Sequence, residues 1–160
     1  HYRSHSFPTR RSSDLPKLVA TLMLLGSQAA FAACNIDVDV GDALTFSATQ
    51  VTVEKSCGSV TLNMKHTGKL AASVMGHNWV LTAEADANDV ASKGLAAGLA
   101  NNYVPAGDSR VIAATKIIGG GESTSITFST DALSVGGKYL YVCTFPGHSF
   151  VMRGTLNVGA

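Results

Sequence analysis

Residues 138–158, KYLYVCTFPGHSFVMRGTLNV, determine how this chain folds. The segment begins with aromatic and aliphatic residues, KYLYVC, and ends with GTLNV, in which apolar and polar residues alternate. Short runs of this kind, bounded by Pro, Gly and Ser, are typical of β-strands. The stretch therefore predicts two consecutive strands, joined by a loop that carries a thiol, an imidazole and a thioether at Cys143, His148 and Met152.

Earlier segments repeat this pattern of short apolar runs separated by turn residues. Between 59 and 65, for example, Val60, Leu62 and Met64 alternate with polar residues, as expected for a strand with one buried face. Residues 83–103 are instead rich in alanine, which indicates an inserted, partly helical flap. Seven or eight short strands with glycine turns predict an all-β fold, namely a Greek-key antiparallel β-sandwich with a short helical flap. The remaining predicted strands are 35–40, 44–53, 79–82 and 125–130.

The first 32 residues have the pattern of a processing segment. Basic residues up to Lys17 precede a short apolar run at 18–25, and Ala30-Phe-Ala32 supplies the small residues of a cleavage site. This order is typical of a secretory signal peptide, and the apolar run is shorter than the ~20 residues of a membrane span. We therefore expect an N-terminal extension with a signal peptide at 1–32 and one exported domain without a membrane span at 33–160.

The composition excludes several classes of protein. Charged residues make up only 14% of the chain, and the formal net charge is +1. A nucleic-acid-binding protein needs a basic face to neutralise phosphates, so we expect no nucleic-acid partner. With 46% hydrophobic residues the chain has enough apolar surface to form a core, which argues against disorder.

The chain contains three cysteines, of which two lie near the start of the predicted domain. In an oxidising compartment a pair such as Cys34 and Cys57 normally forms a disulfide. Cys143 is then left without a partner. A leftover thiol in an exported protein is either a buried small apolar side chain or a group with a chemical role.

The neighbours of Cys143 favour a chemical role. His148 and Met152 lie in the same loop, and a second histidine, His77, lies in a turn beside another predicted strand. Two imidazoles, one thiolate and a thioether are the ligands of a blue-copper centre. Soft sulfur ligands suit Cu(I) and imidazoles suit Cu(II), so the set predicts a copper ion that changes its oxidation state by one electron.

Three stretches resemble the azurin group of the cupredoxin family of blue-copper proteins: VMGHNWVL at 74–81, DSRVIA at 108–113 and CTFPGH at 143–148. The resemblance extends over essentially all of the predicted domain, and the Cys-x4-His-x3-Met spacing is specific to this group. It implies that three residues are equatorial copper ligands, that Met152 is a long axial ligand and that the carbonyl of Gly76 makes a weak contact. The implied equatorial ligands are His77, Cys143 and His148.

The resemblance also implies roles for residues around the ligands. Asn78 would tie the two ligand loops together, and the backbone N–H groups of Asn78 and Phe145 would donate to the Cys143 sulfur. Cys34 and Cys57 match the disulfide pair of the family. An apolar face around the second copper histidine would dock redox partners, although Phe150 is bulkier than the small residue expected there. Its residues would be Leu70, Val74, Met75, Phe145, Pro146 and Phe150.

These features together predict a periplasmic electron carrier rather than an enzyme. A catalytic copper site normally leaves a coordination position open for substrate, whereas here four side chains and an apolar cover are expected. The expected partners are redox proteins, such as a c-type cytochrome or a copper or haem reductase, which a monomer would meet in brief encounters. Other histidines and aromatic residues have structural interpretations: we expect His66 to be buried away from the metal and Trp79 to be a core aromatic.

Three other functions remain open on the sequence. A copper storage or delivery protein could use the same ligands, although storage should need several clusters of soft ligands. Cys143 could be a nucleophile with His148 as its base, but the sequence offers no third orienting group. A structural or adhesive sandwich with an inert Cys143 is the last possibility, and it requires that copper fails to bind.

Overall fold

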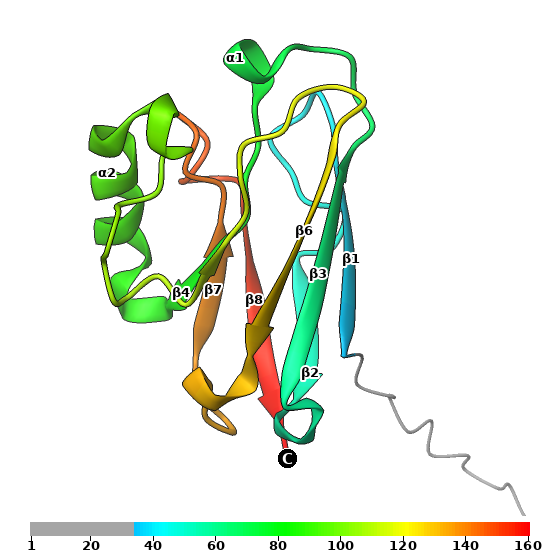
Figure 1. Ribbon diagram of the computed structural model, residues 1–160, viewed down its shortest axis with the longest axis vertical. Helices are drawn as coiled ribbons and strands as arrows, with labels where there is room; N and C mark the ends of the chain where they lie inside the picture. The colour runs from blue at the N-terminus through cyan, green and yellow to red at the C-terminus, as the bar shows by residue number, and fades with distance from the viewer. Residues whose placement is uncertain (1–33) are drawn as a thin grey trace, which may run out of the picture. The chain divides into compact units, whose positions relative to one another are not determined.

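The computed structural model describes residues 34–160, so the extension and signal peptide predicted at 1–32 lie outside the described residues. The described chain forms two β-sheets that pack face to face (Figure 1). The all-β sandwich with a short helical flap is thereby confirmed.

Three strands form the smaller sheet and five form the larger one. The smaller sheet has the order β1-β3-β6, with β1 at Asn35–Val40, β3 at Ser59–His66 and β6 at Ser123–Ser129. The larger sheet has the order β2-β8-β7-β4-β5, with β2 at Gln50–Glu54, β8 at Arg153–Gly159, β7 at Tyr139–Val142, β4 at Val80–Ala83 and β5 at Ala113–Ala114.

Helices are short and lie in the connections between strands. The longest is α2, Ala87–Ala97, within the predicted flap, and α1 spans only Ala72–Met75. Single 3-10 turns make up the rest: η1 at Lys55–Cys57, η2 at Glu84–Asp86, η3 at Leu99–Asn101 and η4 at Thr130–Ala132. None of the helices within residues 34–160 is long and apolar enough to cross a membrane.

The strand pairing departs from the prediction in one respect, because it is not antiparallel throughout. β1 pairs with β3 in parallel, as β2 does with β8, whereas the other pairs are antiparallel. The chain passes from β1 into the opposite sheet at β2 before it returns to β3. Each passage reverses the direction of the chain, so β1 and β3 run the same way.

The strand predicted at 44–53 forms only in its second half, as β2. The first half crosses between the sheets: the backbone turns at Ala43, whose carbonyl accepts from the Thr45 amide at 2.9 Å. Phe46 is nevertheless buried and packs edge-on against Tyr141, with ring centroids 5.3 Å apart. Leu44 is exposed, so burial in this half is confined to Phe46 and reflects a crossing segment rather than strand pairing.

The core between the sheets is centred on aromatic side chains. Trp79 is fully buried, as predicted, and stacks on Tyr141 at 5.2 Å and on Phe128 at 6.0 Å. The inward positions of β3 are also confirmed, since Val60, Leu62 and Met64 are all buried.

The flap helix α2 covers the outer face of the larger sheet (Figure 1). Its buried residues recur every three or four positions, which is the spacing of one helix face. This face packs against Val80 of β4 and Val142 of β7. The buried α2 residues are Ala87, Val90, Ala91 and Gly94.

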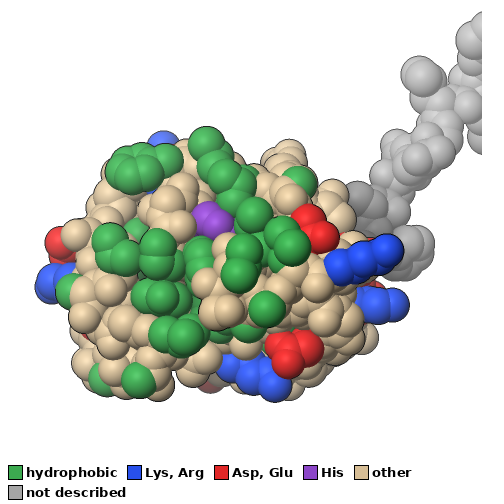
Figure 2. Space-filling view, turned by 90° about the horizontal axis from the view of Figure 1, so that it is seen from above, with side chains coloured by type: hydrophobic (Ala, Val, Ile, Leu, Met, Phe, Trp, Pro, Cys, Tyr) green, Lys and Arg blue, Asp and Glu red, His purple; other side chains and the backbone are tan. Residues whose placement is uncertain are grey.

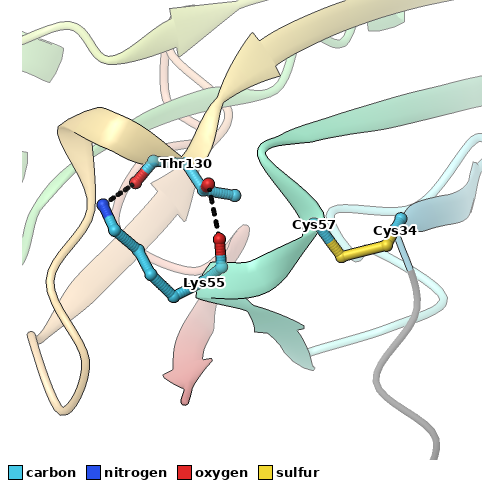
Figure 3. The surroundings of a disulfide bond; sticks show 4 residues. All are labelled: Cys34, Lys55, Cys57 and Thr130. Atoms are coloured by element: carbon cyan, nitrogen blue, oxygen red, sulfur yellow. Dashed lines mark hydrogen bonds between the residues drawn. A yellow bond between two sulfur atoms is a disulfide. The ribbon is translucent and has the colours of Figure 1, made fainter.

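A disulfide between Cys34 and Cys57 joins the start of β1 to η1 and confirms the predicted pair (Figure 3). Beside it, the Lys55 ammonium donates to the carbonyls of Thr130 at 2.6 Å and Leu133 at 2.7 Å. The Thr130 hydroxyl donates back to the Lys55 carbonyl at 2.9 Å. These bonds tie η1 to η4, at the end of the sandwich from which β1 and β3 start.

Candidate metal centre

Neighbouring strands of the larger sheet bring the predicted ligand loops together. β4 and β7 are adjacent, and their register places Val80 opposite Val142. His77 therefore precedes β4 at the same end of the sheet at which Cys143 follows β7. The loop between β7 and β8 closes on itself, because the Cys143 amide donates to the Met152 carbonyl at 3.0 Å.

Three of the predicted ligands converge on one buried point. The Cys143 sulfur lies 3.7 Å from Nδ1 of His77 and 3.6 Å from Nδ1 of His148. All three ligand atoms lie within 4.8 Å of one another. Cys143 and His77 are completely buried, and His148 is only 5% exposed.

The loop that carries these ligands also holds Met152. The Met152 amide donates to the His148 carbonyl at 2.8 Å, while the His148 amide donates to the Phe145 carbonyl at 3.0 Å. Met152 is fully buried. A tight turn therefore brings the thioether-bearing residue back beside the residue that provides the second imidazole.

A backbone hydrogen bond determines which nitrogen of His77 is free. Nε2 lies 2.8 Å from the carbonyl oxygen of Gly41, an acceptor, so Nε2 carries the proton. The lone pair is then on Nδ1, the nitrogen that faces Cys143. Donation of the second ring N–H to a backbone carbonyl is the usual way in which proteins orient a metal-binding histidine.

Burial strongly affects the protonation of the thiol. It raises the pKa of Cys143 to about 11, although the backbone N–H groups of Asn78 and Phe145 donate to the sulfur and act in the opposite direction. These two donors are the ones expected from the sequence. A cation at this site would favour the thiolate, the form in which cysteine binds metals.

Burial also keeps both imidazoles neutral. It lowers the pKa of His148 to about 4, with a smaller contribution from the neighbouring His77. The pKa of His77 is lowered as well, again chiefly by burial. Neutral imidazoles are the form that binds metal ions, so near pH 7 only Cys143 has a proton to lose.

The side chain of Asn78 links the two ligand loops. Its Oδ1 accepts from the Thr144 amide at 2.8 Å, and its Nδ2 donates to the Thr144 hydroxyl at 2.7 Å. Thr144, like the Gly41 carbonyl, was not singled out from the sequence. Thr144 could have been identified from its position directly after Cys143, whereas nothing in the sequence indicated a role for Gly41.

Gly76 lies where only glycine fits. A Cβ at this position would lie 2.2 Å from the Ala72 carbonyl oxygen, 2.7 Å from Ile117 and 3.1 Å from Phe145. The residue directly before His77 is therefore enclosed by α1 and by the loop that contains Phe145.

His66 lies outside the cluster of ligand atoms, as expected. It is fully buried and stacks on His77, with ring centroids 5.1 Å apart. Its Nδ1 accepts from the Gly68 amide at 3.1 Å, so its Nε2 donates to the Met75 carbonyl at 3.0 Å. The side chain thus connects β3 to α1 and supports the ring of His77.

Apolar side chains surround the point at which the site reaches the surface. Figure 2 shows a hydrophobic face with a histidine in its middle, and His148 is the described histidine with exposed surface. Of the side chains predicted for this face, Phe145 is buried and packs against His148 at 4.7 Å, and Met75 is half-buried. Leu70, Val74, Pro146 and Phe150 are exposed.

The residues present fit a copper ion. Copper in blue-copper sites takes two imidazole nitrogens and a thiolate, with a weak thioether. The cluster provides this set in a site closed to water, with both Nδ1 atoms directed at the sulfur and with N–H donors to stabilise the thiolate. His77, Cys143, His148 and Met152 are thus arranged as a blue-copper site.

Comparisons with known proteins agree with this assignment. The family model of copper binding proteins, plastocyanin/azurin family, matches residues 32–159. Azurin-1 of Alcaligenes xylosoxydans xylosoxydans is 51% identical over 127 residues, which cover 79% of this chain and 98% of the relative. The azurin of Achromobacter denitrificans is 49% identical over 143 residues, covering 87% and 96%.

A solved structure gives the same result. The azurin Az-iso2 of Methylomonas sp. strain J superposes with a TM-score of 0.77 at 48% identity, over 81% of this chain and 100% of that one. The fold, the ligand cluster and these relatives point the same way. This chain belongs to the plastocyanin/azurin family of copper-binding proteins and is a blue-copper electron carrier.

Proposed function

We propose that this protein carries single electrons between redox proteins in the periplasm, with copper bound by His77, Cys143, His148 and Met152. The observation that carries the proposal is the position of the buried Cys143 sulfur, 3.7 Å and 3.6 Å from the Nδ1 atoms of the two histidines. Bound copper supplies a one-electron couple between Cu(II) and Cu(I).

The protein's own contribution is to hold its ligands ready before the metal binds. Cys143 loses its proton on binding, and the N–H groups of Asn78 and Phe145 stabilise the resulting thiolate. The Gly41 carbonyl orients His77. The Gly76 carbonyl is a further weak contact in this proposal. Because these partners are backbone groups fixed by the fold, the ligands move little when the charge of the site changes.

The apolar face is the proposed docking surface. His148 lies at its centre and provides the short route between partner and metal. Phe150 is 83% exposed and lines a groove of about 250 Å³ between α2 and the metal loop, together with Leu95 and Pro146. The residues that line the groove carry no charge. Small apolar contacts suit short-lived complexes, such as those with a c-type cytochrome or a copper or haem reductase.

The periplasmic location is supported by two features of the chain. Residues 1–32 have the pattern of a secretory signal peptide. The Cys34–Cys57 disulfide is a bond that persists in oxidising compartments.

Copper storage or delivery is less well supported. Storage calls for several clusters of soft ligands, whereas residues 34–160 hold one group of three or more metal-binding side chains. Thiol catalysis by Cys143 is also disfavoured, because burial raises its pKa to about 11 and the thiol is inaccessible.

The test uses residues 33–160 titrated with Cu(II). An intense visible band should appear at one equivalent, bleach with reductant and return with oxidant, and electrons should pass to a c-type cytochrome. The Cys143→Ser variant should lose the band, with Thr52→Ser, at an exposed position of β2, as the control. Absence of the band in the unmodified protein, with Cys143 still titratable by a thiol reagent in denaturant, would contradict copper ligation.

A further inference from the structure

A left-handed turn lies beside the metal centre. Asn102 and Tyr103 have φ of 53° and 54°, and they are the non-glycine residues with positive φ within residues 34–160. Asparagine is tolerated in this conformation, but a bulky residue such as tyrosine is uncommon there. Backbone strain of this kind persists only where the surroundings enforce it.

The carbonyls of this turn accept hydrogen bonds from the residues that follow two of the ligands. The Asn102 carbonyl accepts from Nδ2 of Asn78 at 2.8 Å, and the Tyr103 carbonyl accepts from the Thr144 hydroxyl at 2.7 Å. Asn78 directly follows His77, and Thr144 directly follows Cys143. Consecutive residues with helical backbone angles point their carbonyl oxygens in nearly the same direction. The left-handed pair can therefore accept hydrogen bonds from the Asn78 and Thr144 side chains at once.

Hydrogen bonds to the flap and to the segment that contains Ile117 hold the turn in place. The amides of Asn102 and Tyr103 donate to the carbonyls of Leu99 at 2.8 Å and Gly98 at 2.9 Å. Oδ1 of Asn102 accepts from the Ile117 amide at 3.0 Å. The ring of Tyr103 packs edge-on against Phe145, with centroids 5.5 Å apart.

The helix α2 lies directly against the turn at Gly94. A Cβ on Gly94 would lie 2.2 Å from the Tyr103 carbonyl oxygen and 3.4 Å from Cβ of Thr144. The flap therefore contacts the oxygen that accepts the hydrogen bond from Thr144. Its close fit restricts where that oxygen can lie.

We propose that the left-handed turn at Asn102–Tyr103 positions the copper site, and that the helix α2 serves to hold this turn. The turn fixes Asn78 and Thr144, and through them the backbone on which His77 and Cys143 are mounted. Asn102 and Tyr103 are positioning residues and touch no ligand atom. This inference rests on the proposed copper site, and it gives the inserted flap a role in it.

The test compares two variants of the turn with one control. Gly94→Ala adds a methyl group against the Tyr103 carbonyl, and Asn102→Gly relieves the strain and removes the acceptor for Ile117. The control, Ala96→Gly, weakens the same helix through an exposed position. In the metal-free protein, hydrogen exchange at the Thr144 amide should accelerate about fivefold in both turn variants, as expected when about one hydrogen bond is weakened, and remain unchanged in the control.

Copper-loaded protein provides the second readout. Release of copper to a chelator should be about tenfold faster in Gly94→Ala and Asn102→Gly, and the visible band should shift, whereas Ala96→Gly should match the unmodified protein. Turn variants that match the unmodified protein in both measurements, or a control that changes as much as they do, would overturn the proposal. Failure of the unmodified protein to form a blue site would refute the copper function itself, and the metal-free exchange would still report on the turn.

Discussion

The Nε2–H of His77 donates a hydrogen bond of 2.8 Å to the carbonyl oxygen of Gly41, which lies 36 positions earlier in the chain. Gly41 follows the last residue of β1 in the smaller sheet, whereas His77 precedes β4 in the larger one. The bond therefore joins the two sheets across the metal end of the sandwich and leaves Nδ1 of His77 unprotonated, facing Cys143.

This bond predicts that His77 has the same orientation with and without copper. The Nε2 proton should be visible by NMR and slow to exchange in the metal-free protein, as well as in protein loaded with copper and reduced to diamagnetic Cu(I). The reason is that the Gly41 backbone carbonyl, not the metal, holds the ring. A His77 Nε2 proton that appears only after metal loading would contradict preorganisation of the site.

Replacing Met152 should change the redox properties of copper without preventing its binding. Met152→Leu preserves side-chain volume but removes the weak axial donor that tunes the potential. Although a thioether is soft, Cu(II) carries the higher charge and loses more stabilisation than Cu(I) when any donor is removed. The reduction potential, measured by voltammetry, should therefore rise. Met64→Leu is the matched control, because Met64 is equally buried but lies on β3 in the core. Equal potentials in the two variants would exclude an axial role for Met152.

The exposed ring of Phe150 should affect encounters with redox partners. Phe150→Ser should slow bimolecular electron transfer to a c-type cytochrome and leave the reduction potential unchanged, because Phe150 is 83% exposed and packs on the rim of the docking face. Val135→Ser is the control, an exposed apolar residue in the turn before β7. Stopped-flow rates distinguish the cases, and equal slowing in both variants would count against this docking face.

Removing the disulfide should destabilise the fold but not the metal site. The double variant Cys34→Ser, Cys57→Ser removes a covalent bond between residues 23 positions apart. In the chain-entropy model this lowers the free energy of unfolding by about 3 kcal/mol. The disulfide lies at the start of β1, about 20 Å along the strand from the Gly41 end. Chemical denaturation should therefore show a lower midpoint while the visible spectrum is retained. A changed spectrum would mean that the two ends of the sandwich are coupled.

An ion pair beside the flap should make stability depend on pH. The Asp108 carboxylate accepts from Nε of Arg110 at 2.9 Å and from Nη2 at 2.6 Å, and these bonds hold the pKa of Asp108 well below its ordinary value of 3.8. A carboxyl group whose pKa is lower in the folded protein than in the unfolded chain stabilises the fold above pH 3.8. This stabilisation is lost progressively as the pH falls below 3.8. Asp108→Asn should thus lower the denaturation midpoint slightly at pH 7, and the difference should shrink toward pH 2. A difference that stays constant over this range would exclude the charge as its cause.

Strand positions were predicted well where one face of a strand is buried. In β3 the alternation of Val60, Leu62 and Met64 with polar residues is what a half-buried strand requires, and the structure matches it. The first half of the strand predicted at 44–53 was wrong, because Phe46 is buried there while Leu44 is exposed, and the segment does not form a paired strand. Phe46 is buried in a segment that crosses between the sheets. The Ser47 amide donates to the Asp39 carbonyl of β1 at 2.9 Å, but this contact does not extend into a paired strand.

The sequence by itself determined the chemistry of this protein, because the affinity of a ligand for a metal and its charge are properties of the side chain. A thiol, two imidazoles and a thioether can be identified from the sequence wherever the fold places them. The spacing of three of them in one loop, Cys143, His148 and Met152, was also a local property. Only the tertiary structure decided which backbone groups hold these ligands. The Gly41 carbonyl on His77 and the Asn102–Tyr103 carbonyls on Asn78 and Thr144 come from distant segments. Every residue has the same backbone carbonyl, so its partner is set by where the fold places it.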